Sequence, residues 1–280
     1  MNTKNQSLPG PASRSTAAGN LDAFTLIDLA VVIAIIGLLA VMVLPTLAGT
    51  KGRACAANDI SNFKQTMTGM MMYCNENNDY MPAPGWNNGS ACWIIAANIQ
   101  PAVMANHTLA NYQTHVIYQT AWFTGIGKPP MIIGPPGPGQ LYQYLKNPNI
   151  FRCPEDMVVN SAYLARGELI SSYIWNGAIV AYGENAFDVS KPYKISRFKP
   201  TNILQWEGNE KITSGGIWND FSGYPSDGGN PAFSQRHGNA APVGRIDGSA
   251  GHVLYADMVN WANDTNLNDL WYSPITANGH

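Results

Sequence analysis

The sequence predicts an α+β protein in which one long N-terminal helix leads into a globular head. Residues 24–47 form an almost purely apolar run, residues 51–74 continue with apolar side chains at helical spacing, and residues 151–280 contain short aromatic and β-branched runs between turn residues. We expect the apolar half of the helix to project and its amphipathic half to pack on an antiparallel β-sheet in a loop-rich head. The predicted parts are a hydrophilic leader at 1–23, the helix at 24–78 and the head at 79–280.

The apolar run is long enough to cross a membrane. As a helix, residues 24–47 would extend about 36 Å, compared with roughly 30 Å of hydrocarbon in a bilayer. A secretory signal has a shorter apolar core, about 7–15 residues, with a small-residue cleavage site directly after it. Here Pro45, Gly49 and Lys51 lead into further helix instead. A plain membrane anchor would explain the whole segment except Asp28, an acid near its start.

The second half of the helix is amphipathic. Its apolar residues recur at spacings of three and four with polar residues between them, and they are Ala56, Ile60, Phe63, Met67, Met70 and Cys74. The stretch NENNDYMPAPGW, residues 75–86, is rich in turn formers and ends the helix. In the head, the segments 171–182, 202–208, 241–248 and 252–259 have the composition of strands.

The composition indicates an exported protein without a nucleic-acid partner. Only 12% of the 280 residues are charged, the formal net charge is −2, and the Lys and Arg residues are scattered. Phosphate binding needs clustered positive charge. In an exported domain, four cysteines without a C-x-x-C pair suggest two disulfides, with buried free thiols as the alternative. We expect Cys74 to pair with Cys92, close to the helix exit, and Cys55 with Cys153.

The sequence contains no nucleophile elbow, HExxH, Walker or dinucleotide-binding motif, so we expect no enzymatic activity. His237, Asp247, His252 and Asp257 could be drawn together as a metal or acid/base site. We favour ordinary structural roles for them. Asp247 and Gly248 occupy a predicted hairpin turn, His252 and Asp257 begin and end a predicted strand, and His237 is a hydrogen-bonding residue at a strand end.

The N-terminal segment resembles that of type IV pilins and type II secretion pseudopilins, which carry an N-terminal methylation segment. In that class, a short leader is cut before a Phe, an acid follows four residues later, and a Gly and a Pro lie further along the helix. Phe24, Asp28, Gly37 and Pro45 match this order and spacing. Two residues depart from the pattern, because the family places Gly where this chain has Ala23 and Glu where it has Asp28.

The head resembles the large-headed pilin-like proteins of planctomycete- and verrucomicrobia-type bacteria. The stretches NFKQTMTGMMMYCNENNDYMP (62–82) and FRCPED (151–156) resemble their helix exit and a turn of their head. His237, Asp247 and Gly248 fit their signature of a His, nine residues and Asp-Gly. Three residues before the position of Asn62 the family usually has a Cys, where this chain has Asp59.

The resemblance implies a structural subunit of an extracellular type IV pilus-like filament or secretion pseudopilus. The chain would cross the inner membrane once and be cut between Ala23 and Phe24 by a prepilin peptidase. It would then assemble with copies of itself and other pilins or pseudopilins into a periplasmic or extracellular filament. Asp28 would neutralise the Phe24 amine of a neighbouring subunit, and the segment from Gly37 to Pro45 would loosen in the filament. The alternative is a membrane-anchored extracytoplasmic binding protein that does not polymerise.

The C-terminal tail is the one place where the resemblance suggests a ligand. Some pseudopilins hold calcium in a C-terminal loop, and this tail places oxygen-bearing side chains at Asp264, Asn266, Asn268 and Asp269. The EF-hand pattern fails, because Ile275 stands where the bidentate Glu would be. We therefore favour a loop of Asx turns, with calcium as the less favoured reading, and expect no other cofactor.

Overall fold

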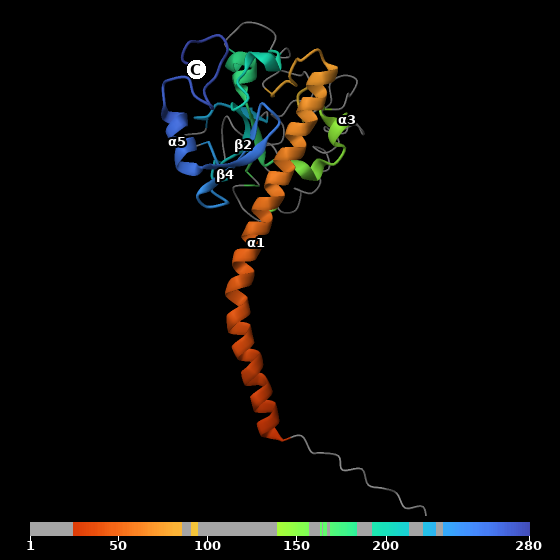
Figure 1. The fold of residues 1–280 in the computed structure, drawn as a ribbon, viewed down its shortest axis with the longest axis vertical. Coiled ribbons are helices and arrows are strands. Elements are labelled where there is room, and N and C mark those ends of the chain that lie inside the picture. Colours follow the sequence, from red (N-terminus) through yellow and green to blue (C-terminus); the bar gives the residue numbers. More distant parts are fainter. Residues whose placement is uncertain are drawn as a thin grey trace, which may run out of the picture. The chain divides into compact units, whose positions relative to one another are not determined.

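The computed structural model describes residues 25–85, 91–94, 139–156, 163, 165–166, 169–183, 192–212, 221–227 and 232–280, with the backbone alone at 44–51. The predicted leader and its cleavage site at Ala23 and Phe24 lie outside these residues. The chain divides into two compact units, Met1–Gly49 and Thr50–His280. The fold is α+β and begins with a long helix, as the sequence predicts, and its sheet is mixed (Figure 1).

Helix α1, Leu26–Glu76, begins in the first unit and is continuous through Gly37 and Pro45. Its start is a capping box. The backbone N–H of Thr25 donates to Asp28 Oδ2 at 2.9 Å, and the N–H of Asp28 donates to the Thr25 hydroxyl at 3.2 Å. The stretch Leu26–Val43 is apolar and long enough to span a membrane, and none of it is buried.

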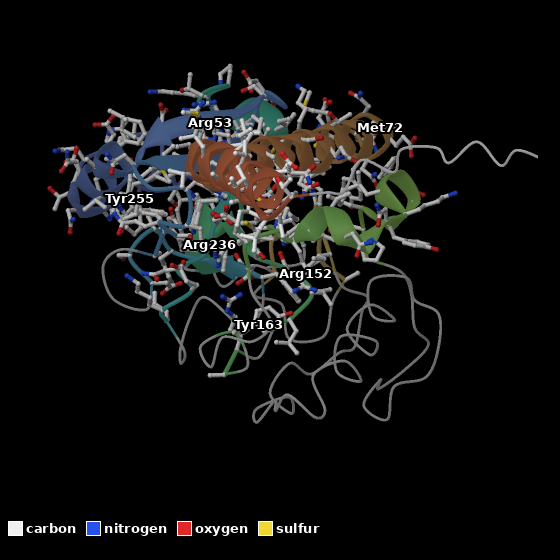
Figure 2. The ribbon with its side chains drawn as sticks, turned by 90° about the horizontal axis from the view of Figure 1, so that it is seen from below. Arg53, Met72, Arg152, Tyr163, Arg236 and Tyr255 are labelled. Carbon is white, nitrogen blue, oxygen red and sulfur yellow. The ribbon has the colours of Figure 1, made fainter. Side chains whose placement is uncertain are left out.

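In the second unit, the amphipathic half of α1 forms one wall of the core. Phe63, Met67, Met70 and Cys74 are at most 2% exposed, which confirms the predicted apolar face. Figure 2 shows Arg53 and Met72 toward opposite ends of this part of α1. The helix packs closely on the sheet, because a Cβ added to Gly244 would lie 2.8 Å from the Met67 side chain. A residue without a side chain at this position permits the approach.

The sheet has five strands in the order β3-β1-β2-β4-β5. The strands are β1 (Tyr173–Asn176), β2 (Ile203–Glu207), β3 (Ser222–Gly223), β4 (Ala240–Arg245) and β5 (Ala250–Leu254). The expected antiparallel pairing holds for β1 with β2, β2 with β4 and β4 with β5, whereas β1 and β3 are parallel. The prediction of a purely antiparallel sheet is therefore wrong. Strand β3 follows β2 in the sequence but pairs with the other edge of β1. The long connection between β1 and β3 allows the two strands to run parallel.

Each face of the sheet carries its own apolar cluster. Tyr173, Trp175 and Leu204 belong to the cluster on the side of α1. Ile174 and Trp206 face the other way, toward helix α5 (Tyr255–Asn263), because successive side chains of a strand point to opposite faces. The shorter helices are α3 (Tyr142–Leu145), η2 (Pro148–Phe151), η3 (Gly177–Gly183) and η4 (Ile195–Arg197).

Two predicted strands end earlier than expected. The segment 171–182 is a strand only as far as Asn176, whose side-chain amide donates to the carbonyls of Ile203 and Leu270. The segment 252–259 leaves the sheet at Leu254 and continues as α5. Asp257 therefore lies in the first turn of a helix and does not end a strand. The helix forms because Met258 and Ala262, four residues apart, are buried against the sheet.

The expected disulfides, Cys74 with Cys92 and Cys55 with Cys153, do not form; all four cysteines are thiols. Cys153 Sγ instead lies 3.5 Å from His237 Nε2. The residue of α1 that lies near these two side chains is Asp59, one helical turn beyond Cys55. Cys74 Sγ contacts Met70 Sδ at 3.6 Å within the helix. The register of α1 therefore places a carboxylate, and not a thiol, beside Cys153.

The C-terminal tail forms the predicted Asx turns. Asp264 Oδ1 accepts from the backbone N–H of Asn266 at 3.0 Å, and Asn268 Oδ1 accepts from those of Leu270 and Trp271 at 2.8 and 2.9 Å. Asp269 Oδ1 accepts from the Thr201 hydroxyl at 2.8 Å. These oxygens therefore hold the loop itself, while calcium binding there stays a prediction.

Candidate functional site

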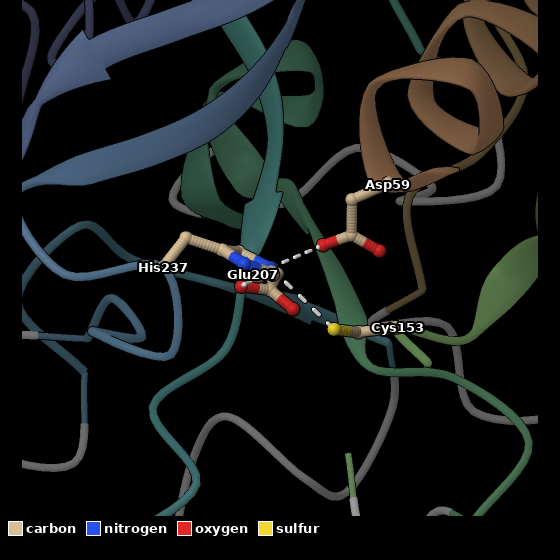
Figure 3. A group of neighbouring side chains, drawn as sticks. All are labelled: Asp59, Cys153, Glu207 and His237. Carbon is tan, nitrogen blue, oxygen red and sulfur yellow. Dashed lines mark hydrogen bonds and ion pairs between the residues drawn. The ribbon is translucent and has the colours of Figure 1, made fainter. Parts of the chain in front are cut away.

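Four side chains from distant parts of the sequence meet in the interior of the head. Asp59, Cys153, Glu207 and His237 each offer one nitrogen, oxygen or sulfur atom, and these atoms all lie within 4.8 Å of one another. We call these four residues the DCEH cluster (Figure 3). Asp59 and Glu207 are 0% and 2% exposed, and the side chain of His237 is 3% exposed. Nitrogen, sulfur and oxygen donors of this kind are the ligands that transition metals use in proteins.

A β-bulge directs Glu207 into the cluster. The pairing of β2 with β4 shifts register between Ile203 and Gln205. Beyond the shift, Trp206 faces α5, and Glu207 lies opposite Tyr173 on the face toward α1. Bulges commonly re-aim side chains in this way.

The other three members come from α1 and from two turns. Asp59 precedes Phe63 by one helical turn, so it extends the buried face of α1. Cys153 follows η2, where its N–H donates to the Ser172 hydroxyl at 3.1 Å. His237 lies in the turn before β4, in which Gly238 has φ +71°.

His237 Nε2 is the centre of the cluster. It lies 2.9 Å from Asp59 Oδ2, 3.5 Å from Glu207 Oε2 and 3.5 Å from Cys153 Sγ. A ring nitrogen carries at most one proton, so it can donate to only one of these three atoms. Among the described residues, Glu207 Oε2 is a buried oxygen without a hydrogen-bond partner.

A second layer of charged groups surrounds the cluster. Arg236 Nη1 donates to Glu207 Oε1 at 2.7 Å, and Nη2 lies 3.3 Å from Asp156 Oδ1. Asp156 is held by both terminal nitrogens of Arg166, at 2.6 and 2.9 Å, and by the Ser172 hydroxyl at 2.6 Å. Because buried charges are costly unless they are paired, this layer keeps Arg236 and Glu207 ionised inside the head.

The pKa values in the metal-free cluster follow from burial and these contacts. Burial raises the pKa of Asp59 to about 6, although the hydrogen bond with His237 opposes the shift. Burial also raises the pKa of the Cys153 thiol. Burial disfavours the charged form of His237, but its hydrogen bond with Asp59 and the nearby Glu207 carboxylate outweigh this and raise its pKa to about 10. Without a cation, His237 is therefore an imidazolium ion between two carboxyl groups.

Of the four residues that the sequence suggested as a site, only His237 belongs to the cluster. Asp247 accepts from the N–H of Ser249 at 2.8 Å in the turn between β4 and β5, where Gly248 has φ +83°, so the predicted hairpin is confirmed. His252 lies within β5, opposite Pro242, and Asp257 lies on α5. The sequence signal for Asp59 was that it stands where the similar family usually has a Cys. The signal for Cys153 was its place in the FRCPED turn. Glu207 had no signal beyond being an acid in an apolar strand.

A polar pocket of about 580 Å³ borders the cluster, and its lining includes Cys153 and Asp156. Much of the rest is amide side chains, namely Asn58, Asn62, Gln65, Asn147 and Asn149. Cys153 is therefore the member of the cluster that also lines this pocket. In comparisons with protein-family models, curated proteins and solved structures, no match to this chain was found.

Proposed function

We propose that this chain is a structural subunit of a type IV pilus-like filament or secretion pseudopilus, held in the inner membrane and assembled through the start of α1. The observation that carries the proposal is the exposed apolar helix. Every large apolar side chain from Leu26 to Val43 is 46–85% exposed in the chain by itself. Burying one such side chain is worth about 1.5–3 kcal/mol, so this surface requires a bilayer or other helices around it.

The continuity of α1 supports a filament subunit in particular. A simple anchor needs only the apolar segment and a linker, whereas here one helix of 51 residues contains the apolar segment and a wall of the head's core. The same helix would therefore take part both in packing among subunits and in the core of the head. The order Phe24, Asp28, Gly37 and Pro45 adds the resemblance to pilins described above.

Asp28 has two possible roles. In the chain by itself its carboxylate closes the capping box with Thr25, with Oδ2 2.6 Å from the hydroxyl and 2.9 Å from the N–H. In an assembled bundle, we propose that it also neutralises the amine released at Phe24 of a neighbouring subunit, because a buried amine needs a counter-charge. A membrane-anchored binding protein would need only the capping role.

The proposal is tested by identifying the material of surface filaments. We expect antibodies against the head to label filaments in electron micrographs, and mass spectrometry of sheared filaments to find a mature N-terminus at Phe24. Replacing Ala23 with a bulky residue should keep the leader attached and abolish the filaments. A chain that retains its leader and stays in the membrane fraction, in cells without labelled filaments, would refute the filament role and favour the anchored binding protein.

A further inference from the structure

We propose that Asp59, Cys153, Glu207 and His237 bind one Zn²⁺ ion, which joins α1 to the rest of the head. This proposal is independent of the filament role, because it concerns only contacts within the second unit. Asp59 and His237 lie 178 positions apart in the sequence. A single ion would therefore connect α1, the turn after η2, the end of β2 and the turn before β4.

The three donor atoms around His237 Nε2 lie near the spacing of a tetrahedral zinc site, and all four donor atoms lie within 4.8 Å of one another. With zinc–ligand bonds of about 2.0–2.3 Å, the donor atoms of a tetrahedron lie about 3.3–3.7 Å apart. The distances from His237 Nε2 to the other three donors are 2.9, 3.5 and 3.5 Å. Small side-chain movements would complete the geometry. One nitrogen, one sulfur and two carboxylate oxygens also suit zinc better than calcium or magnesium, which prefer oxygen ligands only.

Each proposed ligand is held from behind by another group, while one of its donor atoms faces the shared centre. Asp59 Oδ1 accepts from the Tyr173 hydroxyl at 2.6 Å, and Glu207 Oε1 accepts from Arg236 at 2.7 Å. His237 Nδ1 lies 3.6 Å from Glu155 Oε2. The N–H of Glu155 donates to Cys153 Sγ at 3.3 Å. Outer contacts of this kind orient the ligands of metal sites.

The cluster without an ion leaves a polar atom unsatisfied. Glu207 Oε2 is buried without a hydrogen bond, although the His237 ring nitrogen lies 3.5 Å away. That nitrogen is closer to Asp59 Oδ2, and it has only one proton to donate. A cation at the centre would contact this oxygen and the other three donors at once.

The charges also balance around a divalent ion. Two carboxylates and a Cys153 thiolate carry three negative charges, which Zn²⁺ and the Arg236 side chain on Glu207 compensate. Asp156, which Arg236 also contacts, has Arg166 as its own counter-charge. All four ligands come from the protein and are nearly or fully buried, as in structural zinc sites, which leave no position open for a substrate. The polar pocket lined by Cys153 is where we expect the ion to enter.

The experiment uses the full-length chain in detergent, stripped of metal and then supplied with Zn²⁺ or Co²⁺. We expect one ion per chain by elemental analysis, and a higher melting temperature with Zn²⁺ than after stripping. Co²⁺ should produce the strong visible absorption of a tetrahedral site and a sulfur-to-cobalt charge-transfer band. A folded wild-type chain that binds no stoichiometric metal would overturn the proposal and leave a metal-free cluster centred on the His237 imidazolium.

Matched variants test which residues bind the ion. Cys153→Ser should abolish the charge-transfer band, whereas Cys74→Ser, which replaces another buried thiol, should retain it. Tyr173→Phe keeps all four ligands but frees Asp59 Oδ1, so it should preserve the band and weaken binding about 10- to 100-fold. A thiolate band that survives in Cys153→Ser, or cobalt bound without such a band in the wild type, would place the ion elsewhere and refute the proposal. If Cys153→Ser does not fold, the wild-type spectrum decides.

Discussion

Two substitutions at the start of α1 separate the possible roles of its acid. Thr25→Ala removes the hydroxyl that accepts from the N–H of Asp28 at 3.2 Å, but it leaves the Asp28 carboxylate and the residue 25 N–H that donates to it at 2.9 Å. Asp28→Ala removes the carboxylate itself. If the acid only caps the helix, both variants should assemble equally well. If it also pairs with the amine of a neighbour, only Asp28→Ala should fail.

The expected magnitudes differ enough to be measured. Loss of an N-cap hydroxyl costs about 0.5–2 kcal/mol, which frays one turn of a helix that the core of the head fixes further along. An unpaired amine in a dry helix bundle costs several kcal/mol, and each 1.4 kcal/mol is about a tenfold change in an equilibrium. We therefore expect near-normal filament numbers for Thr25→Ala and at least about a hundredfold fewer for Asp28→Ala.

The assay counts filaments per cell by electron microscopy, with the amount of each variant in the membrane checked by immunoblot. Asp28→Ala should enter the membrane at least as well as the wild type, because the apolar segment has lost its acid. Asp28→Glu should assemble, because it keeps the charge. Normal filaments from Asp28→Ala, or an equal loss in Thr25→Ala, would refute the pairing and leave helix capping as the role of the acid.

Three further predictions concern the head. Gly248→Ala should lower the free energy of unfolding, measured in urea, by about 1–2 kcal/mol, because φ is +83° and the new Cβ would lie 3.0 Å from the Met71 side chain. Gly238→Ala is the control: its φ is +71°, but the new Cβ would enter open space, so the loss of stability should be smaller. Equal losses in the two variants would contradict this prediction. Arg236 and Arg166 outweigh burial and hold the pKa of Asp156 below 3.8, so its contribution to stability is present above about pH 4 and is lost as the pH falls through the lowered value. In Asp156→Asn, the free energy of unfolding should no longer fall at acid pH in the way that it does in the wild type. An unchanged dependence on pH would show that another group causes the fall. Adding calcium to the metal-free chain should leave the melting temperature unchanged, because the oxygens of the loop after α5 already accept hydrogen bonds; a clear rise would favour the calcium reading.

The local pattern of the sequence was sufficient for helix α1. Its apolar run and the later spacing of three and four residues are properties of neighbouring positions, so the buried face with Phe63 and Met67 could be predicted. The Asp247-Gly248 hairpin was predictable for the same reason, since a turn of this kind depends on a few adjacent residues. The end of β5 was not predictable, because a short apolar run fits a strand or a helix until its packing partner is known. The segment after β5 is a helix because this conformation buries Met258 and Ala262 against the sheet.

The sequence alone therefore determined the amphipathic helix, the composition of the strands and the exposed apolar segment, all of which depend on local order. Only the tertiary structure decided which residues form the DCEH cluster. Its members come from four separate segments, and no spacing in the sequence relates Asp59 to His237 across 178 positions. The face on which Glu207 lies depends on a register shift between β2 and β4, which is a property of two paired strands and is not encoded in either strand alone. The register of α1 on the sheet likewise placed Asp59 beside Cys153, where a disulfide with Cys55 had been expected.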